Sequence, residues 1–192
     1  VAGFTTEPDA KALTELGRRA HIPVAFDLGG GTLRSLDQWG LPHEPVVTDS
    51  LRAGFDVVTF SGDKILGGPQ SGILAGKAEL IDRMKLSPLM RTLRCDKLIL
   101  AALEATLDLY RLDNETLSQA LPTLRMMTES VDLVEARAEL LLAQISTVAR
   151  QKLGAAVVST KAQAGSGALP VEELDSFALA CSDGNAEALA RH

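Results

Sequence analysis

The sequence predicts an α/β protein with a mostly parallel sheet and helices on both faces of that sheet. Two observations lead to this prediction. Helical segments alternate with short apolar runs over residues 8–85, and the apolar runs are continuous instead of alternating with polar residues. Strands that are buried on both faces have this continuous pattern, and parallel strands need helical crossovers between them.

Apolar periodicity and turn residues locate the individual elements. In the first helix, apolar residues recur at helical spacing and Gly17 weakens the pattern without ending it. Thr48 is a candidate N-cap for a short helix that Gly54 closes. In chain order the expected elements are a helix over 8–20, a strand over 23–28, a helix over 48–54, strands over 56–61 and 71–77, and a helix over 78–86.

The character of the chain changes after this region. A long helix is expected over 96–110 and a second helical tract over 121–147, followed by two strands around a glycine-rich turn at 165–167. We therefore predict a domain boundary near Leu112, with a first domain over 1–112 and a small α+β domain over 113–192. Both ends of the sequence read like the interior of a domain, so we expect a partial chain.

Composition narrows the class of protein. The 192 residues are 46% hydrophobic and 23% charged, which is typical of a globular domain. No apolar run approaches the roughly 20 residues of a membrane span. Cys95 and Cys181 form no paired motif, which favours reduced thiols and a cytoplasmic location. The net charge of −6 gives no global sign of nucleic-acid binding, and no metal site is expected.

A strand that ends in Asp27 and continues into three glycines, in "FDLGGGT", permits two interpretations. It resembles the phosphate loop of actin-like ATPases, but the segment that follows does not alternate as the next strand of that fold would. It also has the layout of a pyridoxal phosphate (PLP) site. There, an aspartate at a strand end keeps the pyridine nitrogen protonated, so that the ring can accept electrons.

The second loop, "TFSGDKILGGPQSGIL", favours the PLP interpretation. Lys64 follows a buried strand by three residues, and burial favours the neutral amine that Schiff-base chemistry needs. Ser61 can donate to a phosphate oxygen from the same turn, and the glycines let the backbone approach a flat ring. Because ligands of parallel sheets bind at the carboxyl ends of strands, Asp27 and Lys64 are expected to lie close together.

Four segments together resemble the bacterial L-seryl-tRNA(Sec) selenium transferases, or selenocysteine synthases, which are fold-type-I PLP enzymes. These segments are "GFTTEP", "FDLGGGT", "TFSGDKILGGPQSG" and "MRTLRCDKLILAALEATL". The resemblance implies that residues 1–112 are the C-terminal part of a large PLP-binding domain. Gly30 is a mild departure, because the family often has a serine among these glycines.

The resemblance also implies roles for particular residues. Lys64 would bond covalently to PLP, Asp27 would pair with the pyridine nitrogen, and Asp63 would lie beside the site. Ser61 would contact the cofactor phosphate. The two guanidinium groups in "RTLRCDK", Arg91 and Arg94, would bind selenophosphate, the selenium donor, for which their charge and forked donors are suited.

The activity implied is the conversion of seryl-tRNA(Sec) to selenocysteinyl-tRNA(Sec) through an aminoacrylyl intermediate, in a ring-shaped homo-oligomer, a decamer. The tRNA contacts would then belong mainly to an N-terminal domain. One alternative keeps the PLP site in a related β-eliminating or ammonia lyase that acts on a small phosphorylated amino acid or an amino-sugar acid. Another is that these 192 residues alone bind PLP poorly, because parts of such sites come from outside them.

Overall fold

The computed structural model describes residues 9–163 and 173–182. The chain forms two compact units, of which the first continues to Thr128 and the second begins at Glu129. The elements of the first unit are α1 (Ala10–Ala20), β1 (Ala25–Gly29), the 3-10 helix η1 (Leu36–Trp39), α2 (Val47–Arg52), β2 (Val57–Ser61), β3 (Gly72–Gly76), α3 (Ala78–Lys85), α4 (Pro88–Leu93), α5 (Lys97–Leu109), α6 (Asn114–Ala120) and α7 (Pro122–Met127). Those of the second are α8 (Val131–Gln144), α9 (Thr147–Leu153), β4 (Ala155–Ala162) and β5 (Leu174–Cys181).

The sheet of the first unit has the strand order β1-β2-β3. β1 and β2 are parallel and are connected through α2, as the sequence predicts. β3 is antiparallel to β2, so the prediction of a mostly parallel sheet is wrong for this strand. The reason is the connection, because residues 62–71 contain no helix and a parallel return needs a crossover.

The two faces of this sheet differ in burial. Phe26, Val58 and Phe60 lie on one face in a core cluster with Phe55, whose ring stacks on that of Phe26 at 4.7 Å between centroids. Side chains from α1, α2 and α5 pack against the same cluster. Since successive strand residues point to opposite faces, Asp27 lies on the other face, where it is exposed. The Asp27 side chain therefore projects away from the core.

Asp56 joins all three strands at one end of the sheet. Its Oδ2 accepts a hydrogen bond of 2.7 Å from the backbone N–H of Val24, and its Oδ1 pairs with Nζ of Lys77 at 2.5 Å. Its own backbone bonds the same two residues, with the N–H donating to Val24 and the carbonyl accepting from Lys77. The Lys77 ammonium and the Val24 N–H hold the pKa of the Asp56 carboxyl below its usual value.

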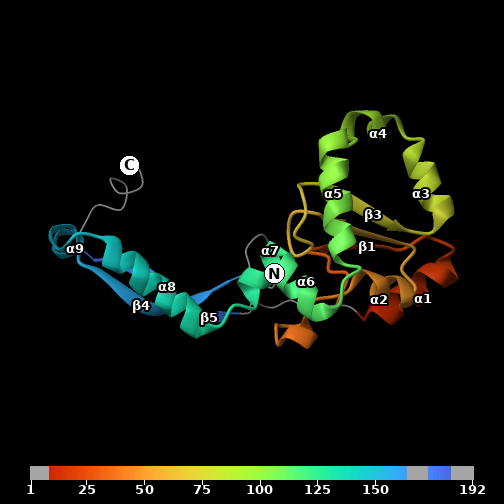
Figure 1. Cartoon of the computed structure of the whole chain (residues 1–192). Coiled ribbons are helices and arrows are strands. Elements are labelled where there is room, and N and C mark those ends of the chain that lie inside the picture. The colour runs from red at the N-terminus through yellow and green to blue at the C-terminus, as the bar shows by residue number, and fades with distance from the viewer. Residues whose placement is uncertain (1–8, 164–172, 183–192) are drawn as a thin grey trace. The chain divides into compact units, whose positions relative to one another are not determined.

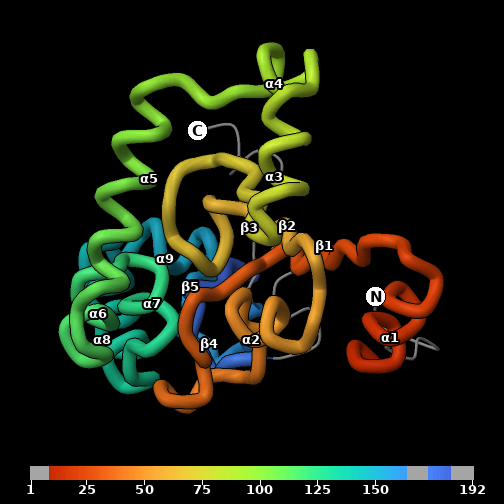
Figure 2. Tube along the Cα trace, turned by 90° about the vertical axis from the view of Figure 1, so that its right-hand side faces the viewer, coloured from red at the N-terminus to blue at the C-terminus, as the bar shows by residue number. Residues whose placement is uncertain are grey.

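Helices α3, α4 and α5 form an arch beside the sheet, with α4 at the far end of the arch from the strands (Figures 1 and 2). None of the three helices has a fully buried side chain in the part of the chain that the structure describes. The large apolar side chains that remain exposed along the arch include Leu86, Leu89, Leu93, Leu98 and Leu100. A large exposed apolar surface of this kind usually marks an interaction site.

Contacts across the predicted boundary explain why the first unit continues past Leu112. The Arg34 guanidinium donates to Oδ1 of Asn114, and the Trp39 ring N–H donates to the Asn114 carbonyl at 3.2 Å. Three leucines of the following segment, Leu117, Leu121 and Leu124, are also fully buried. The division into functional domains at 1–112 and 113–192 stays a prediction.

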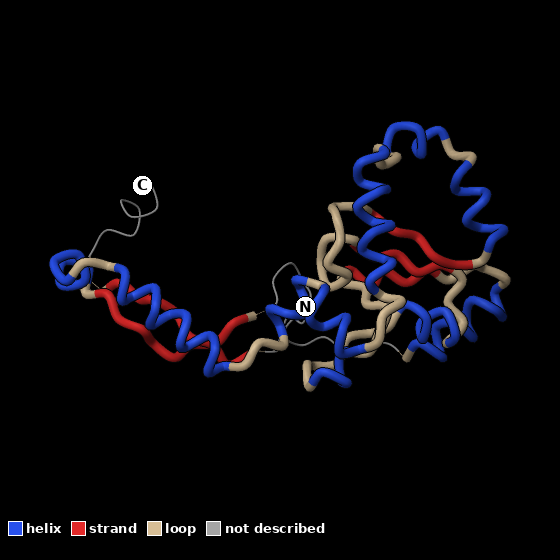
Figure 3. The backbone as a smooth tube through the Cα atoms, in the orientation of Figure 1, coloured by secondary structure: helices blue, strands red, loops and turns tan. Residues whose placement is uncertain are grey.

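In the second unit, α8 packs along the antiparallel pair β4 and β5, as Figure 3 shows. The predicted pair of strands is confirmed, and the turn predicted at 165–167 lies outside the described residues. The helical tract predicted over 121–147 is divided into α7 and α8, because the helix stops at Thr128 and a new one begins after its N-cap, Ser130. No described helix is both long enough and apolar enough to cross a bilayer.

The contacts of Asp56 predict a stability that depends on pH. A carboxyl whose pKa is lowered by folding stabilises the protein above its unfolded pKa and loses this contribution as the pH falls. We expect Asp56→Asn to lower the free energy of unfolding by about 1–2 kcal/mol at neutral pH, and by much less in acid, once the pH lies below the lowered pKa of this carboxyl in the folded protein. Urea unfolding of the chain at both pH values measures the difference.

Asp82→Asn is the matched control, because Asp82 pairs with Lys85 on an exposed helical surface. Exposed pairs of this kind contribute little. Equal effects of the two substitutions would show that Asp56 does not hold the strands together.

Candidate functional site

Two donors hold the carboxylate of Asp27 at the end of β1. The Thr59 hydroxyl, on the neighbouring strand, donates to Asp27 Oδ1 at 2.8 Å, and the backbone N–H of Gly29 donates to the same oxygen at 3.3 Å. Asp27 and Thr59 are direct partners in the β1–β2 register, which shifts between Asp27 and Gly29. The carboxylate is therefore oriented by both strands.

The glycine turn after β1 depends on two residues with positive φ. Gly29 has φ +63° and Gly31 has φ +54°, in the left-handed region that residues with a side chain rarely adopt. A Cβ at Gly31 would lie 2.3 Å from Cβ of Phe60, which is a core residue of β2. The turn can therefore pack against β2 only with glycine at this position.

Lys64 lies in the turn after β2 and is half-buried. Its Nζ is 3.9 Å from the position that a Cβ on Gly29 would occupy, so the amine lies against the glycine turn. Ile65 and Leu66, which follow it, are buried, and the Tyr110 hydroxyl donates to the Leu66 carbonyl at 3.0 Å. Burial raises the pKa of Tyr110, so this phenol keeps its proton at neutral pH.

The glycine-rich loop that carries Lys64 closes on itself. The N–H of Gly62 donates to the Ser71 carbonyl and the N–H of Gly68 donates to the Gly62 carbonyl, both at 2.8 Å. A Cβ at Gly62 would lie 2.2 Å from the Ser71 hydroxyl oxygen. This close approach explains why residue 62 is glycine. It also holds the backbone in place two residues before Lys64.

The remaining predicted site residues fall into two groups. Ser61 is the last residue of β2 and is half-buried, and Asp63 is exposed in the turn before Lys64. The carboxyl ends of the parallel strands β1 and β2 thus bring Asp27, Ser61 and Lys64 to one edge of the sheet.

The two arginines are elsewhere. Arg91 lies in α4, Arg94 is the C-cap of that helix, and both side chains are exposed. Figure 1 shows α4 at the far end of the arch, away from the three-stranded sheet. A single chain therefore does not place the arginines beside Lys64 in this conformation.

The residues at this edge fit PLP. The cofactor needs an amine for covalent attachment, a carboxylate for its ring nitrogen and donors for its phosphate. Lys64 provides the amine and Ser61 a hydroxyl. Asp27 Oδ2 receives no hydrogen bond from the residues that the structure describes, so it is available to accept one from a pyridinium N–H.

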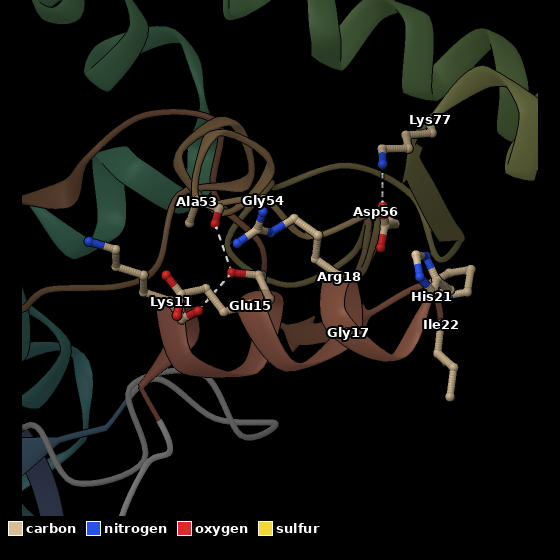
Figure 4. Close-up of a pocket in the computed structure, with 12 residues that line it drawn as sticks. Lys11, Glu15, Gly17, Arg18, His21, Ile22, Ala53, Gly54, Asp56 and Lys77 are labelled. Carbon is tan, nitrogen blue, oxygen red and sulfur yellow. Dashed lines mark hydrogen bonds and ion pairs between the residues drawn. The ribbon is translucent and has the colours of Figure 1, made fainter.

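A separate hollow of about 620 Å³ lies between α1 and the opposite end of the sheet (Figure 4). Its lining includes Lys11, Arg18, His21, Asp56 and Lys77, and none of the predicted site residues. Within residues 9–163 and 173–182, no group of three or more His, Cys, Asp and Glu side chains could hold a metal ion.

Comparison with known proteins agrees with the resemblance noted in the sequence. The model of the L-seryl-tRNA selenium transferase family matches residues 1–192. The chain belongs to this family. Among similar proteins, the L-seryl-tRNA(Sec) selenium transferase of Mannheimia succiniciproducens is 44% identical over 189 residues, which are 98% of this chain and 40% of that protein.

Two further relatives carry the same name. The protein of Escherichia fergusonii is 47% identical over 93% of this chain and 38% of its own length. That of Alkaliphilus metalliredigens is 46% identical over 91% of this chain and 37% of its own length. The chain thus spans about 40% of the length of the family members that it matches.

Sequence reasoning missed Thr59. The signal was present, because Thr59 precedes Ser61 by two residues and so points to the same face of β2. Its pairing with Asp27 required the strand register, which the sequence alone does not provide.

The glycine turn leads to a prediction about stability. We expect Gly31→Ala to destabilise the chain by about 2–3 kcal/mol, because it adds a positive-φ strain to a clash with a core side chain. Gly72→Ala is the control, since a Cβ at Gly72 would meet no atom within 4 Å. Thermal unfolding of the two variants compares them, and equal melting temperatures would contradict the tight packing of the turn on Phe60.

Proposed function

We propose that the gene product containing this chain converts seryl-tRNA(Sec) to selenocysteinyl-tRNA(Sec), with PLP as cofactor and selenophosphate as selenium donor. The observation that carries the proposal is the placement of the Lys64 amine and the Asp27 carboxylate beside the same glycine turn, at the carboxyl ends of two parallel strands. Family membership supplies the substrate, because the relatives are named for seryl-tRNA(Sec).

When bound, PLP withdraws electrons from the α-carbon of the seryl group. Lys64 would hold the cofactor through Nζ and, when free of it, would take the proton from that carbon as a general base. Asp27 Oδ2 would keep the proton on the ring nitrogen, and Ser61 would donate to the cofactor phosphate. The serine hydroxyl would depart as water, selenium would bond to the β-carbon, and the α-carbon would regain its proton from Lys64. A water molecule would then release the phosphoryl group as phosphate.

Arg91 and Arg94 serve as the anion site for selenophosphate in this proposal. Both are exposed cations, near the apolar surface of the arch. Because α4 lies away from the sheet within one chain, the arginines meet the reacting carbon if another copy of the chain supplies them (Figure 1). The exposed leucines of the arch support such a homo-oligomer.

The proposed tRNA substrate must be reconciled with a net charge of −6. tRNA binding needs positive surface. The chain spans about 40% of its relatives' length, so we assign the main tRNA contacts to a further domain of the gene product.

The first test asks whether Lys64 holds the cofactor. Borohydride reduction of the PLP-loaded gene product, followed by peptide mass spectrometry, should locate the cofactor on the Lys64 peptide. Lys64→Ala should abolish this label and lower the turnover of seryl-tRNA(Sec) by about 10²–10⁴-fold or more, because it removes a general base. Lys85→Ala is the control, since Lys85 is exposed on α3 and pairs with Asp82 of the same helix.

The outcomes separate the alternatives. A label on Lys64 with no response to seryl-tRNA(Sec) would leave the PLP site intact and favour a lyase that acts on a small molecule. A protein that takes up no PLP at all would contradict the proposal.

The second test concerns the arginines. Arg91→Ala and Arg94→Ala should each raise the KM for selenophosphate by about 10–100-fold, because each removes charge-assisted hydrogen bonds. The reductive label on Lys64 should remain. Steady-state kinetics with varied selenophosphate measure the effect, and Arg83→Ala on α3 is the matched control. An unchanged KM in both variants would exclude the arginines from the anion site.

A further inference from the structure

We propose that Thr59 is a positioning residue of the cofactor site, which holds Asp27 so that its second oxygen faces the ring nitrogen of PLP. The inference rests on the proposed function, because it assigns a role within the same site. The decisive geometry is the hydrogen bond of 2.8 Å from the Thr59 hydroxyl to Asp27 Oδ1.

The hydroxyl and the carboxylate are brought together by the sheet itself. Asp27 and Thr59 are paired residues of β1 and β2, and both point to the face opposite the core cluster. Thr59 is half-buried and its β-branched side chain has few rotamers available, so its hydroxyl is held in place. The donor therefore needs little reorganisation to hold the carboxylate.

The two hydrogen bonds to Asp27 reach the same carboxylate oxygen and leave the other one open. The Thr59 hydroxyl and the backbone N–H of Gly29 both donate to Oδ1. Oδ2 receives no hydrogen bond from the described part of the chain. A hydroxyl has a single proton to donate, so the Thr59 donor is committed to Oδ1 while Oδ2 stays open.

Without the hydroxyl, the carboxylate would lose its stronger restraint. The Gly29 bond is longer, at 3.3 Å, and Asp27 is exposed and forms no ion pair among the described residues. Rotation about its terminal bond would then cost little, because that torsion is broad. The carboxylate would spend less time in the orientation that a pyridinium N–H requires.

The test compares Thr59→Val, which removes the hydroxyl and keeps the branched shape, with Thr59→Ser, which keeps the hydroxyl. Valine is favourable in a strand, so both variants should fold. In the PLP-loaded gene product, we expect Thr59→Val to raise the dissociation constant of PLP about tenfold, because a hydrogen bond to a charged group is lost. Thr59→Ser should stay within about twofold of the original.

A second measurement reports the protonation of the ring nitrogen directly. With PLP labelled with ¹⁵N in the ring, Thr59→Val should shift the ¹⁵N resonance toward that of unprotonated pyridine, and Thr59→Ser should not. Asp27→Asn should produce the larger shift. In the Asp27→Asn background, adding Thr59→Val should cause no further shift, because Thr59 acts through Asp27.

Each outcome bears on the inference. An unchanged dissociation constant and ¹⁵N resonance in Thr59→Val, with PLP still on Lys64 in the parent protein, would overturn the role of Thr59 and leave the proposed function standing. A variant that loses affinity equally with or without Asp27 would also overturn it. A parent protein that takes up no PLP on Lys64 would overturn both proposals.

Discussion

The contacts of Asp56 fix the strands on which the candidate site depends. Its carboxylate and its backbone join Val24, at the entry to β1, to Lys77, at the exit of β3. This sets the register of three short strands at one end, and the register of β1 and β2 continues unbroken from there to Asp27. Asp27 pairs with Thr59, and the carboxyl ends of β1 and β2 lie next to each other. A one-residue slip would send these side chains to the other face.

The sequence was sufficient for the elements whose signals are local. Asp96 caps α5 where the helix was expected, and α1 continues through Gly17 although glycine disfavours helix. A tertiary contact explains this, because a Cβ at Gly17 would lie 2.1 Å from the Val24 side chain. Thr48 is not an N-cap, since α2 begins at Val47 after Val46. That helix forms without a capping side chain, so its start could not be located from cap residues.

The candidate site likewise combines residues that local sequence signals reveal with contacts that depend on tertiary structure. Asp27, Ser61 and Lys64 could be selected from the sequence, because strand ends followed by glycines are visible in it and parallel strands share an edge. The Thr59 hydroxyl and the reversal of β3 could not, since both depend on pairing between strands. The position of α4 could not be predicted either. It depends on how α3 and α5 are arranged beside the sheet, and the periodicity of their sequences does not describe that arrangement (Figure 1).

The first unit has one tightly packed surface, which carries the glycine turn and the Lys64 loop, and one exposed apolar surface, which is the arch. The glycine turn packs on Phe60, and the Lys64 loop is held by Leu66 and by the Tyr110 hydroxyl. By contrast, the arch that carries Arg91 and Arg94 buries no side chain fully within the described residues and exposes a row of leucines. A reaction that joins an amino acid ester to an anionic donor needs both a fixed cofactor amine and a separate anion site. In the proposed function, Lys64 would provide the amine on the packed surface. Arg91 and Arg94 would provide the anion site on the arch, where the exposed leucines favour an interaction with a partner.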